Sequence, residues 1–208
     1  MGWVYSIFVL SGFSALLYQV VWQRALFAIY GINVESVTVI VTAFMLGLGV
    51  GSLVGGEVSK RPSRPALLLF SLVELGIGLF GFVSLALFHW VGSLTLGLAP
   101  LATFAVTFFL VLFPTTLMGS TLPLLVAHGV RASHNVGKAV GFLYFVNTLG
   151  SALAAFASVW GLLGTLGQAR TVYVAAAINV TVSALAFMQH RRQRARRSGE
   201  SMTTAHAS

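Results

Sequence analysis

The sequence lacks cysteine and is poor in acidic residues. With no cysteine in 208 residues, the chain has no disulfide bond, no thiol nucleophile and no cysteine-based metal site. Four acidic residues against twelve lysines and arginines give a net charge of +8, which in a water-soluble protein would indicate nucleic-acid binding. Only 8% of the residues are charged, however, and 57% are apolar. We therefore expect a membrane protein with no nucleic-acid partner.

Apolar runs long enough to cross a bilayer make up most of the chain. A hydrocarbon core about 30 Å thick takes roughly 20 helical residues. Six runs fit this length: Trp3–Gln23, Val34–Val54, Ala66–Phe88, a bent span within Pro100–Ala127, Val136–Leu163 and Thr171–Met188. The sequence predicts an all-α, polytopic membrane protein, with a six-helix domain over residues 1–190 and a basic, disordered tail over residues 191–208.

Basic residues are distributed unevenly between the two sides of this arrangement. Arg24 and Arg170 fall on one side, whereas the others fall on the opposite side: Lys60, Arg61, Arg64, Arg131, Lys138, Arg191, Arg192, Arg194, Arg196 and Arg197. The positive-inside rule then predicts an inner or plasma membrane protein with both termini in the cytoplasm. We interpret the five arginines of the tail either as a topological anchor or as a binding site for anionic membrane lipids.

Small residues follow a similar pattern in the two three-span halves. The second span has Gly47, Gly51 and Gly55 at four-residue spacing, and the fifth has Gly150 and Ala154 at the same spacing. Such stripes let helix backbones pack closely in lipid, although glycine is also simply common in membrane helices. The pattern predicts two inverted three-helix repeats, as in half of a major facilitator transporter. Because half a facilitator needs a second half, we expect a homodimer that uses the Gly47 stripe as its packing face.

Glu74 is an acidic residue inside an apolar span. It follows the start of that span by eight residues, or about 12 Å along a helix. A charge at such a depth costs roughly 3 kcal/mol, so the carboxylate should face the bundle interior with a partner or a proton. Two interpretations follow, and the sequence favours neither: a site for a cation or proton, or an internal ion pair or hydrogen bond that fixes helix packing.

The fourth span carries two prolines and several hydroxyl groups. Pro114 and Pro123 each free a backbone carbonyl one turn earlier. In a membrane those carbonyls must be satisfied, and Thr115, Thr116 and Thr121 are the nearby hydroxyl-bearing candidates, together with water or a ligand. The segment is therefore either a broken-helix site for a solute or a kink that its own hydroxyl groups stabilise.

Other polar residues of the first and fifth spans are candidate substrate-binding residues: Tyr18, Gln19, Tyr144, Asn147 and Thr148. Asn147 lies near mid-span, where lipid satisfies neither its donors nor its acceptor, so it should face a helix or a cavity. We assign Trp22, close to the outer end of the first span, to the aromatic belt at the membrane interface.

Histidines and glycines give no sign of a metal or nucleotide site. The five histidines (His89, His128, His134, His190 and His206) lie at span ends or in the tail, and none has a second ligand at helical spacing. No glycine-rich phosphate loop lies between a strand and a helix. We expect no metal, no cofactor and no catalytic acid–base pair.

Five sequence blocks resemble the membrane domain of the spermidine-synthase-like integral membrane proteins: residues 17–24, 43–49, 73–78, 114–123 and 140–150. The similarity extends over about residues 8–186. It implies a domain distantly similar to half of a major facilitator, which in that family is often followed by a soluble aminopropyltransferase-like domain. Because this sequence stops after its sixth span, we expect no synthase activity from it. Gln19 stands where the family block usually has glutamate, which weakens the case for cation binding there.

These observations indicate two candidate functions. The first is a transport-like module for a small polar or cationic solute related to the polyamines. The alternative is a membrane scaffold that recruits a separately encoded, soluble synthase-like enzyme through its loops and basic tail. An integral membrane enzyme ranks third, because no acid–base pair is visible. A neighbouring gene for a soluble synthase would favour the scaffold.

Overall fold

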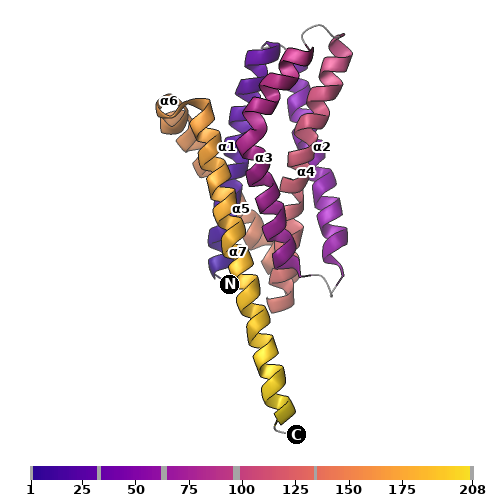
Figure 1. Cartoon of the computed structure of the whole chain (residues 1–208), viewed down its shortest axis with the longest axis vertical. Coiled ribbons are helices and arrows are strands. Elements are labelled where there is room, and N and C mark those ends of the chain that lie inside the picture. The colour runs from indigo at the N-terminus through magenta and orange to yellow at the C-terminus, as the bar shows by residue number, and fades with distance from the viewer. Residues whose placement is uncertain (1, 32–33, 62–64, 96–98, 134, 207–208) are drawn as a thin grey trace.

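The computed structural model describes residues 2–31, 34–61, 65–95, 99–133 and 135–206, and every regular element in these ranges is helical (Figure 1). The elements are α1 (Gly2–Tyr30), α2 (Val34–Ser59), α3 (Ala66–Thr95), α4 (Pro100–Ser133), α5 (Val136–Ala157), the π-helix η1 (Ser158–Leu162), α6 (Leu163–Thr165) and α7 (Gly167–His206). Among the described residues, six helical stretches are long and apolar enough to cross a membrane. The prediction of an all-α, six-span membrane fold is confirmed.

Several helix boundaries have identifiable causes. Pro100 is the first residue of α4, where its missing N–H group costs no helical hydrogen bond. Asn135 caps α5, because its side-chain oxygen accepts the Lys138 backbone N–H at 2.9 Å. Gly31 and Gly167 adopt φ angles of 86° and 72°, a left-handed conformation that glycine reaches without strain. They mark the end of α1 and the tight turn from α6 into α7.

The fifth and sixth spans differ from the sequence-based prediction. The fifth is not one regular helix, because α5 passes into the π-helix η1 at Ser158 and then into the short α6. Within the described residues α7 continues as one helix to His206, into the segment for which the sequence predicts a disordered tail. The arginines that begin at Arg191 end the apolar run, but arginine, glutamine and alanine are good helix formers, so the helix itself continues.

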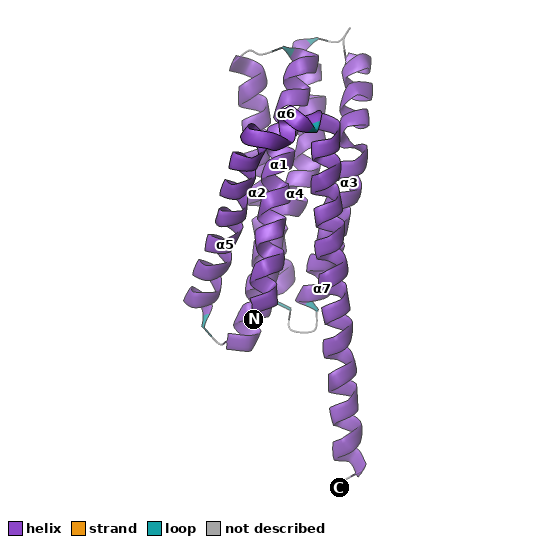
Figure 2. Cartoon of the chain, turned by 90° about the vertical axis from the view of Figure 1, so that its left-hand side faces the viewer, coloured by secondary structure: helices purple, strands orange, loops and turns teal. Residues whose placement is uncertain are grey.

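The two ends of the bundle carry different charges. Both termini lie at one end, together with the last turns of α2 and α4 and the first turns of α3 and α5 (Figure 2). Lys60, Arg131, Lys138 and the α7 arginines from Arg191 on are at this end, whereas Arg24 and Arg170 lie toward the other. The helices therefore alternate in direction, and the end with the termini is the strongly basic one.

The two halves of the chain use the same helix pairings. α4 packs against α2 and α3, which belong to the first half of the chain. In the same way, α1 packs against α5 and α7, which belong to the second half. The third helices of the two halves, α3 and α7, also pack against each other. Exchanging α1 with α4, α2 with α5 and α3 with α7 thus preserves the main contacts. Since successive spans alternate in direction, each exchanged pair is antiparallel. The packing is that of two inverted three-helix repeats.

Close glycine contacts show this equivalence at the level of residues. A methyl group added to Gly150 on α5 would overlap the Val9 carbonyl of α1, and one added to Gly12 on α1 would overlap the Asn147 carbonyl of α5. Gly12 follows Val9 by three residues, and Gly150 follows Asn147 by three. The α1–α5 backbones therefore meet through a reciprocal pair of glycines.

The same reciprocal pair joins α2 and α4. A methyl group on Gly51 of α2 would overlap the Thr116 carbonyl of α4, and one on Gly119 of α4 would overlap the Leu48 carbonyl of α2. The three-residue steps, from Thr116 to Gly119 and from Leu48 to Gly51, match those of the other half. Each half thus contributes an outer helix that docks on the first helix of the opposite half.

This contact corrects the role given to the glycine stripe of α2. Gly47, Gly51 and Gly55 all face α4 of the same chain, where they meet Thr115, Thr116 and Ser120 respectively. The stripe is therefore buried within the chain and is not a free face for a second copy. The sequence shows that a helix packs closely against these glycines, but not which helix.

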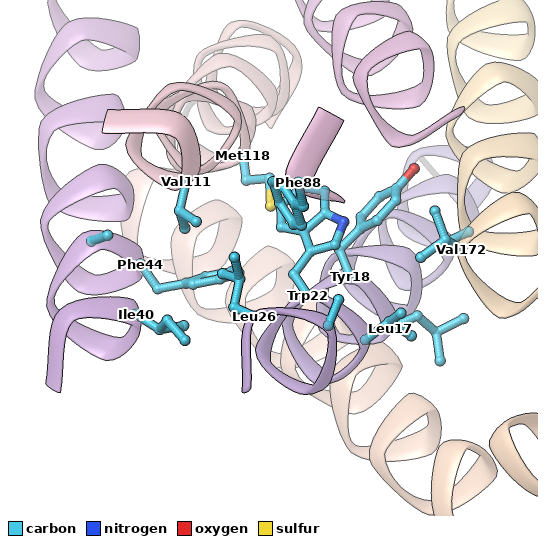
Figure 3. Close-up of a cluster of buried hydrophobic side chains, with 14 of the residues drawn as sticks. Leu17, Tyr18, Trp22, Leu26, Ile40, Phe44, Phe88, Val111, Met118 and Val172 are labelled. Atoms are coloured by element: carbon cyan, nitrogen blue, oxygen red, sulfur yellow. The ribbon is translucent and has the colours of Figure 1, made fainter. Parts of the chain in front are cut away.

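Trp22 lies in the bundle interior and not in the interfacial belt assigned to it. Its side chain is fully buried, and its Nε1–H donates to Ser84 Oγ on α3 at 3.0 Å. Figure 3 shows it between Tyr18 and Phe88, and its ring stacks on Tyr18 with 4.8 Å between centroids. The indole nitrogen finds its polar partner inside the protein, so the ring needs no contact with water.

Candidate functional site

The candidate site is centred on Glu74, a fully buried residue of α3. Ser11 Oγ on α1 donates to Glu74 Oε1 at 2.5 Å, and Asn179 Nδ2 on α7 donates to Glu74 Oε2 at 2.5 Å. Each carboxylate oxygen thus accepts one hydrogen bond from a different helix. Because α1 belongs to one half and α7 to the other, the carboxylate lies at the contact between the two repeats.

The negative charge of Glu74 has no basic partner among the described residues. The ion pair that these residues form joins Glu57 to Lys60 at the end of α2, well outside the bundle core. Ser11 and Asn179 donate neutral hydrogen bonds, which stabilise a carboxylate but do not neutralise it. An isolated buried carboxylate is very costly, so a proton or a cation must balance its charge.

Two buried polar atoms near Glu74 make no hydrogen bond within the described part of the chain: Asn179 Oδ1 and the Tyr18 hydroxyl. Asn179 Oδ1 belongs to the same amide group that donates to Glu74. The Tyr18 hydroxyl lies against Gly81, two helical turns from Glu74 along α3. Buried polar atoms are rarely left unpaired, so these oxygens are available to a proton donor or a cation.

Small side chains bring α1 and α3 close enough for these contacts. Gly81 leaves room for the Tyr18 ring, because an added methyl group there would overlap the Tyr18 hydroxyl. The Ser11–Glu74, Tyr18–Gly81 and Trp22–Ser84 contacts all join residues 62 or 63 positions apart. α1 and α3 therefore run side by side in one register, with a line of polar groups between them.

The hydroxyl groups of α4 are placed away from Glu74. Thr115 Oγ1 donates to the carbonyls of Val111 and Leu112 on its own helix and reaches the Ala43 carbonyl on α2 at 3.4 Å. Thr116 donates to Leu112, and Thr121 donates to Met118. These hydroxyl groups bond to backbone carbonyls around the two prolines. The carbonyls that the two prolines free are those of Leu110 and Gly119, four residues earlier, and these hydroxyl groups bond to other carbonyls of α4.

The polar residues of α5 also lie apart from Glu74. Tyr144 is 63% exposed on the outer surface of α5, and Thr148 is exposed as well. Asn147 is half-buried against Gly12 of α1, where its backbone carbonyl accepts Ser151 Oγ. Of the predicted substrate-binding residues, Tyr18 lies on the same α1–α3 contact as Glu74, two helical turns along α3. Gln19 is half-buried beside it on α1.

The sequence analysis does not identify Ser11 or Asn179 as site residues. Asn179 carried a usable signal, since an amide within the apolar run of the sixth span needs a buried partner just as Asn147 does. The sequence gives no such signal for Ser11, because serine is common in membrane helices and can bond to the backbone of its own helix. Ser183 on α7 is a similar case, since its hydroxyl donates to the Ser71 carbonyl on α3.

The site provides oxygen ligands of the kind that bind a proton, a hard cation or an ammonium group. They are the two carboxylate oxygens of Glu74, the Asn179 amide oxygen and, further along, the Tyr18 hydroxyl. Among the described residues, no group of three or more histidine, aspartate or glutamate side chains could hold a metal ion. Comparison of the chain with protein-family models, with curated proteins and with solved structures gives no match.

Proposed function

We propose that the chain is a membrane transport module in which Glu74 binds a proton in exchange for a small cation, such as a polyamine. The observation that carries this proposal is a fully buried carboxylate without a basic partner among the described residues, at the contact between two inverted repeats. In transporters built from inverted repeats, coupling sites lie near the bilayer midplane at the repeat interface. The unpaired Asn179 Oδ1 beside Glu74 adds a second ligand for a bound cation.

The resemblance to spermidine-synthase-like membrane domains supports the choice of a polyamine as the first solute to test. A protonated amine and a proton would compete for Glu74, so cation binding should weaken as the pH falls. The proposal includes a pair of chains, because six spans make half of a major facilitator. It also includes an inner or plasma membrane with cytoplasmic termini, which the basic end of the bundle supports.

The decisive experiment compares Glu74→Gln with Glu57→Gln in proteoliposomes. Both variants remove one negative charge, but Glu57 is exposed and paired with Lys60. We expect Glu74→Gln to fold and insert normally and to lose pH-dependent binding and flux of radiolabelled spermidine, whereas Glu57→Gln keeps both. Native mass measurement in mild detergent tests the dimer on the same samples.

Three results would contradict this function. Glu74→Gln with full activity but an altered melting temperature would mean that the residue fixes helix packing. A wild-type chain that neither binds spermidine nor moves protons would exclude the proposed exchange. If Glu74→Gln changes neither melting nor binding, both interpretations of Glu74 fail.

A second candidate, a scaffold for a soluble synthase-like enzyme, is favoured by one contact at the basic end. Arg131 Nη2 donates to the carbonyls of Ser59 and Arg61 at 3.1 and 3.2 Å, which ties the segment after α2 to the end of α4. This contact gives the basic end a defined surface. A synthase-like protein encoded beside this chain should then copurify with the wild type but not with Arg131→Gln.

A further inference from the structure

A cavity of about 420 Å³ opens at the basic end of the bundle, between the start of α3, the end of α4 and the part of α7 that extends beyond its apolar run. Its lining is polar and basic on two sides and includes His128, Arg131, His190, Gln193 and Arg194. We infer that this cavity binds the phosphate group of an anionic phospholipid. The inference is independent of the transport proposal, because the cavity lies at the bundle end and excludes Glu74.

The charge in the cavity comes from two helices that face each other. His128 and Arg131 lie three residues apart on α4, and His190 and Arg194 lie four residues apart on α7, so each pair shares a helix face. None of the described residues that line the cavity is acidic. Guanidinium groups bind phosphate through paired, charge-assisted hydrogen bonds, and basic pockets between membrane helices bind anionic headgroups.

Arg131 is held in position by its backbone contacts. Its Nη2 donates to the carbonyls of Ser59 and Arg61, so the guanidinium is oriented by the protein and not only by a ligand. A donor fixed in this way loses less conformational freedom when it binds phosphate. Of the five arginines between Arg191 and Arg197, Arg194 is the one that lines this cavity.

A neighbouring hollow explains why a lipid fits better than free phosphate. This second space, about 430 Å³, shares His190 and Arg194 with the basic cavity, and its other lining residues are Arg191 and the apolar Leu68, Phe187 and Ala195. Phe187 is 43% exposed on the surface of α7. A phosphate in the basic cavity would therefore lie next to an apolar surface at the depth where headgroups join acyl chains, and an acyl chain would cover Leu68 and Phe187.

The test is lipid binding to the purified full chain in detergent, measured by native mass spectrometry. The probes are dioleoyl phosphatidylglycerol, dioleoyl phosphatidylcholine and glycerol 3-phosphate. We expect phosphatidylglycerol to bind most tightly, and Arg131→Gln/Arg194→Gln to weaken its binding about 30-fold, since each basic residue near an anionic headgroup contributes roughly a factor of five. The matched control, Arg192→Gln/Arg196→Gln, loses the same charge from α7 outside this cavity and should weaken binding less than threefold.

Each alternative result overturns the inference. If the two double variants lose phosphatidylglycerol binding equally, the basic helix attracts anions without a defined site. Equal binding of phosphatidylcholine would remove the role of net charge, and equal binding of glycerol 3-phosphate would make the ligand a soluble phosphate. Should the double variant unfold because the Arg131 contacts are lost, Arg194→Gln alone should still weaken phosphatidylglycerol binding about fivefold relative to Arg196→Gln.

Discussion

Asn179 Nδ2 donates to Glu74 Oε2 although the two residues are 105 positions apart in the sequence. α3 and α7 are the third helices of the two halves, and this hydrogen bond is formed where they pack together. A carboxylate at this position is held by both halves at once. Any rearrangement of one half against the other would change its hydrogen bonds, which gives the bundle a direct way to link ligand binding to helix movement.

The first prediction concerns the Asn179 amide. Asn179→Leu keeps the approximate size of the side chain but leaves Glu74 Oε2 without its donor, and we expect a loss of about 1–3 kcal/mol in stability because a buried acceptor is left unsatisfied. Thermal unfolding in detergent measures this loss. Thr181→Val is the control, since the Thr181 hydroxyl is exposed on α7 and bonds to its own helix. If the two variants have the same melting temperature, the Asn179 amide contributes nothing to the stability of the bundle.

The second prediction concerns the interior position of Trp22. Trp22→Phe removes the hydrogen bond to Ser84 and leaves a small cavity, so stability should fall by about 1–3 kcal/mol. Trp90→Phe should change stability by less than about 0.5 kcal/mol, because Trp90 is 61% exposed on the outer surface of α3. The two melting temperatures in one detergent provide the comparison. A tryptophan in the interfacial belt would instead behave like Trp90.

The span count and Glu74 could be predicted from the sequence because both depend on composition along the chain. Apolar length defines a span, and a charge within it must be buried. Which side of a helix faces the protein is a different question, because membrane helices are apolar on all sides and their periodicity says little. The sequence therefore gives no reason to separate Tyr144 and Thr148 from Asn147, although both lie on the outer surface.

For a related reason, the sequence does not show which helix packs against the glycine stripe or which groups the threonine hydroxyls bond to. The stripe that begins at Gly47 predicts close packing equally well against a helix of the same chain or of a second copy. Thr115 and Thr116 can likewise bond to their own helix or to a solute. Only the three-dimensional arrangement shows that α4 covers the stripe and that these hydroxyl groups bond to backbone carbonyls.

The third prediction tests which side of the membrane the basic end occupies. Because the chain has no cysteine, a single introduced cysteine is the only thiol to be labelled. Ala195 is exposed at the basic end and Ala169 is exposed toward the opposite end. In intact cells, a membrane-impermeant maleimide should label Ala169→Cys, and it should label Ala195→Cys only after permeabilisation. The reverse pattern would place the termini outside the cytoplasm.

The last prediction tests whether the two halves are equivalent in energy as well as in geometry. Gly51→Ala and Gly150→Ala each place a methyl group against a backbone carbonyl of the facing helix, which no rotamer change can relieve. Overpacking of this kind costs about 1–3 kcal/mol, more than the gain of up to about 1 kcal/mol that alanine brings to a helix. We therefore expect both variants to melt at lower temperatures and to a similar extent.

Gly49→Ala and Gly141→Ala are the matched controls for the two halves. An added methyl group at either position meets no atom within 4 Å, so the helix propensity of alanine acts alone and stability should stay level or rise. Since Gly51 and Gly150 share no partner residue, the double variant should lose roughly the sum of the two single losses. If the Gly51 variant melts early while the Gly150 variant does not, the α1–α5 contact is looser than the α2–α4 contact. The inverted repeats would then match in arrangement but not in the strength with which each outer helix is held.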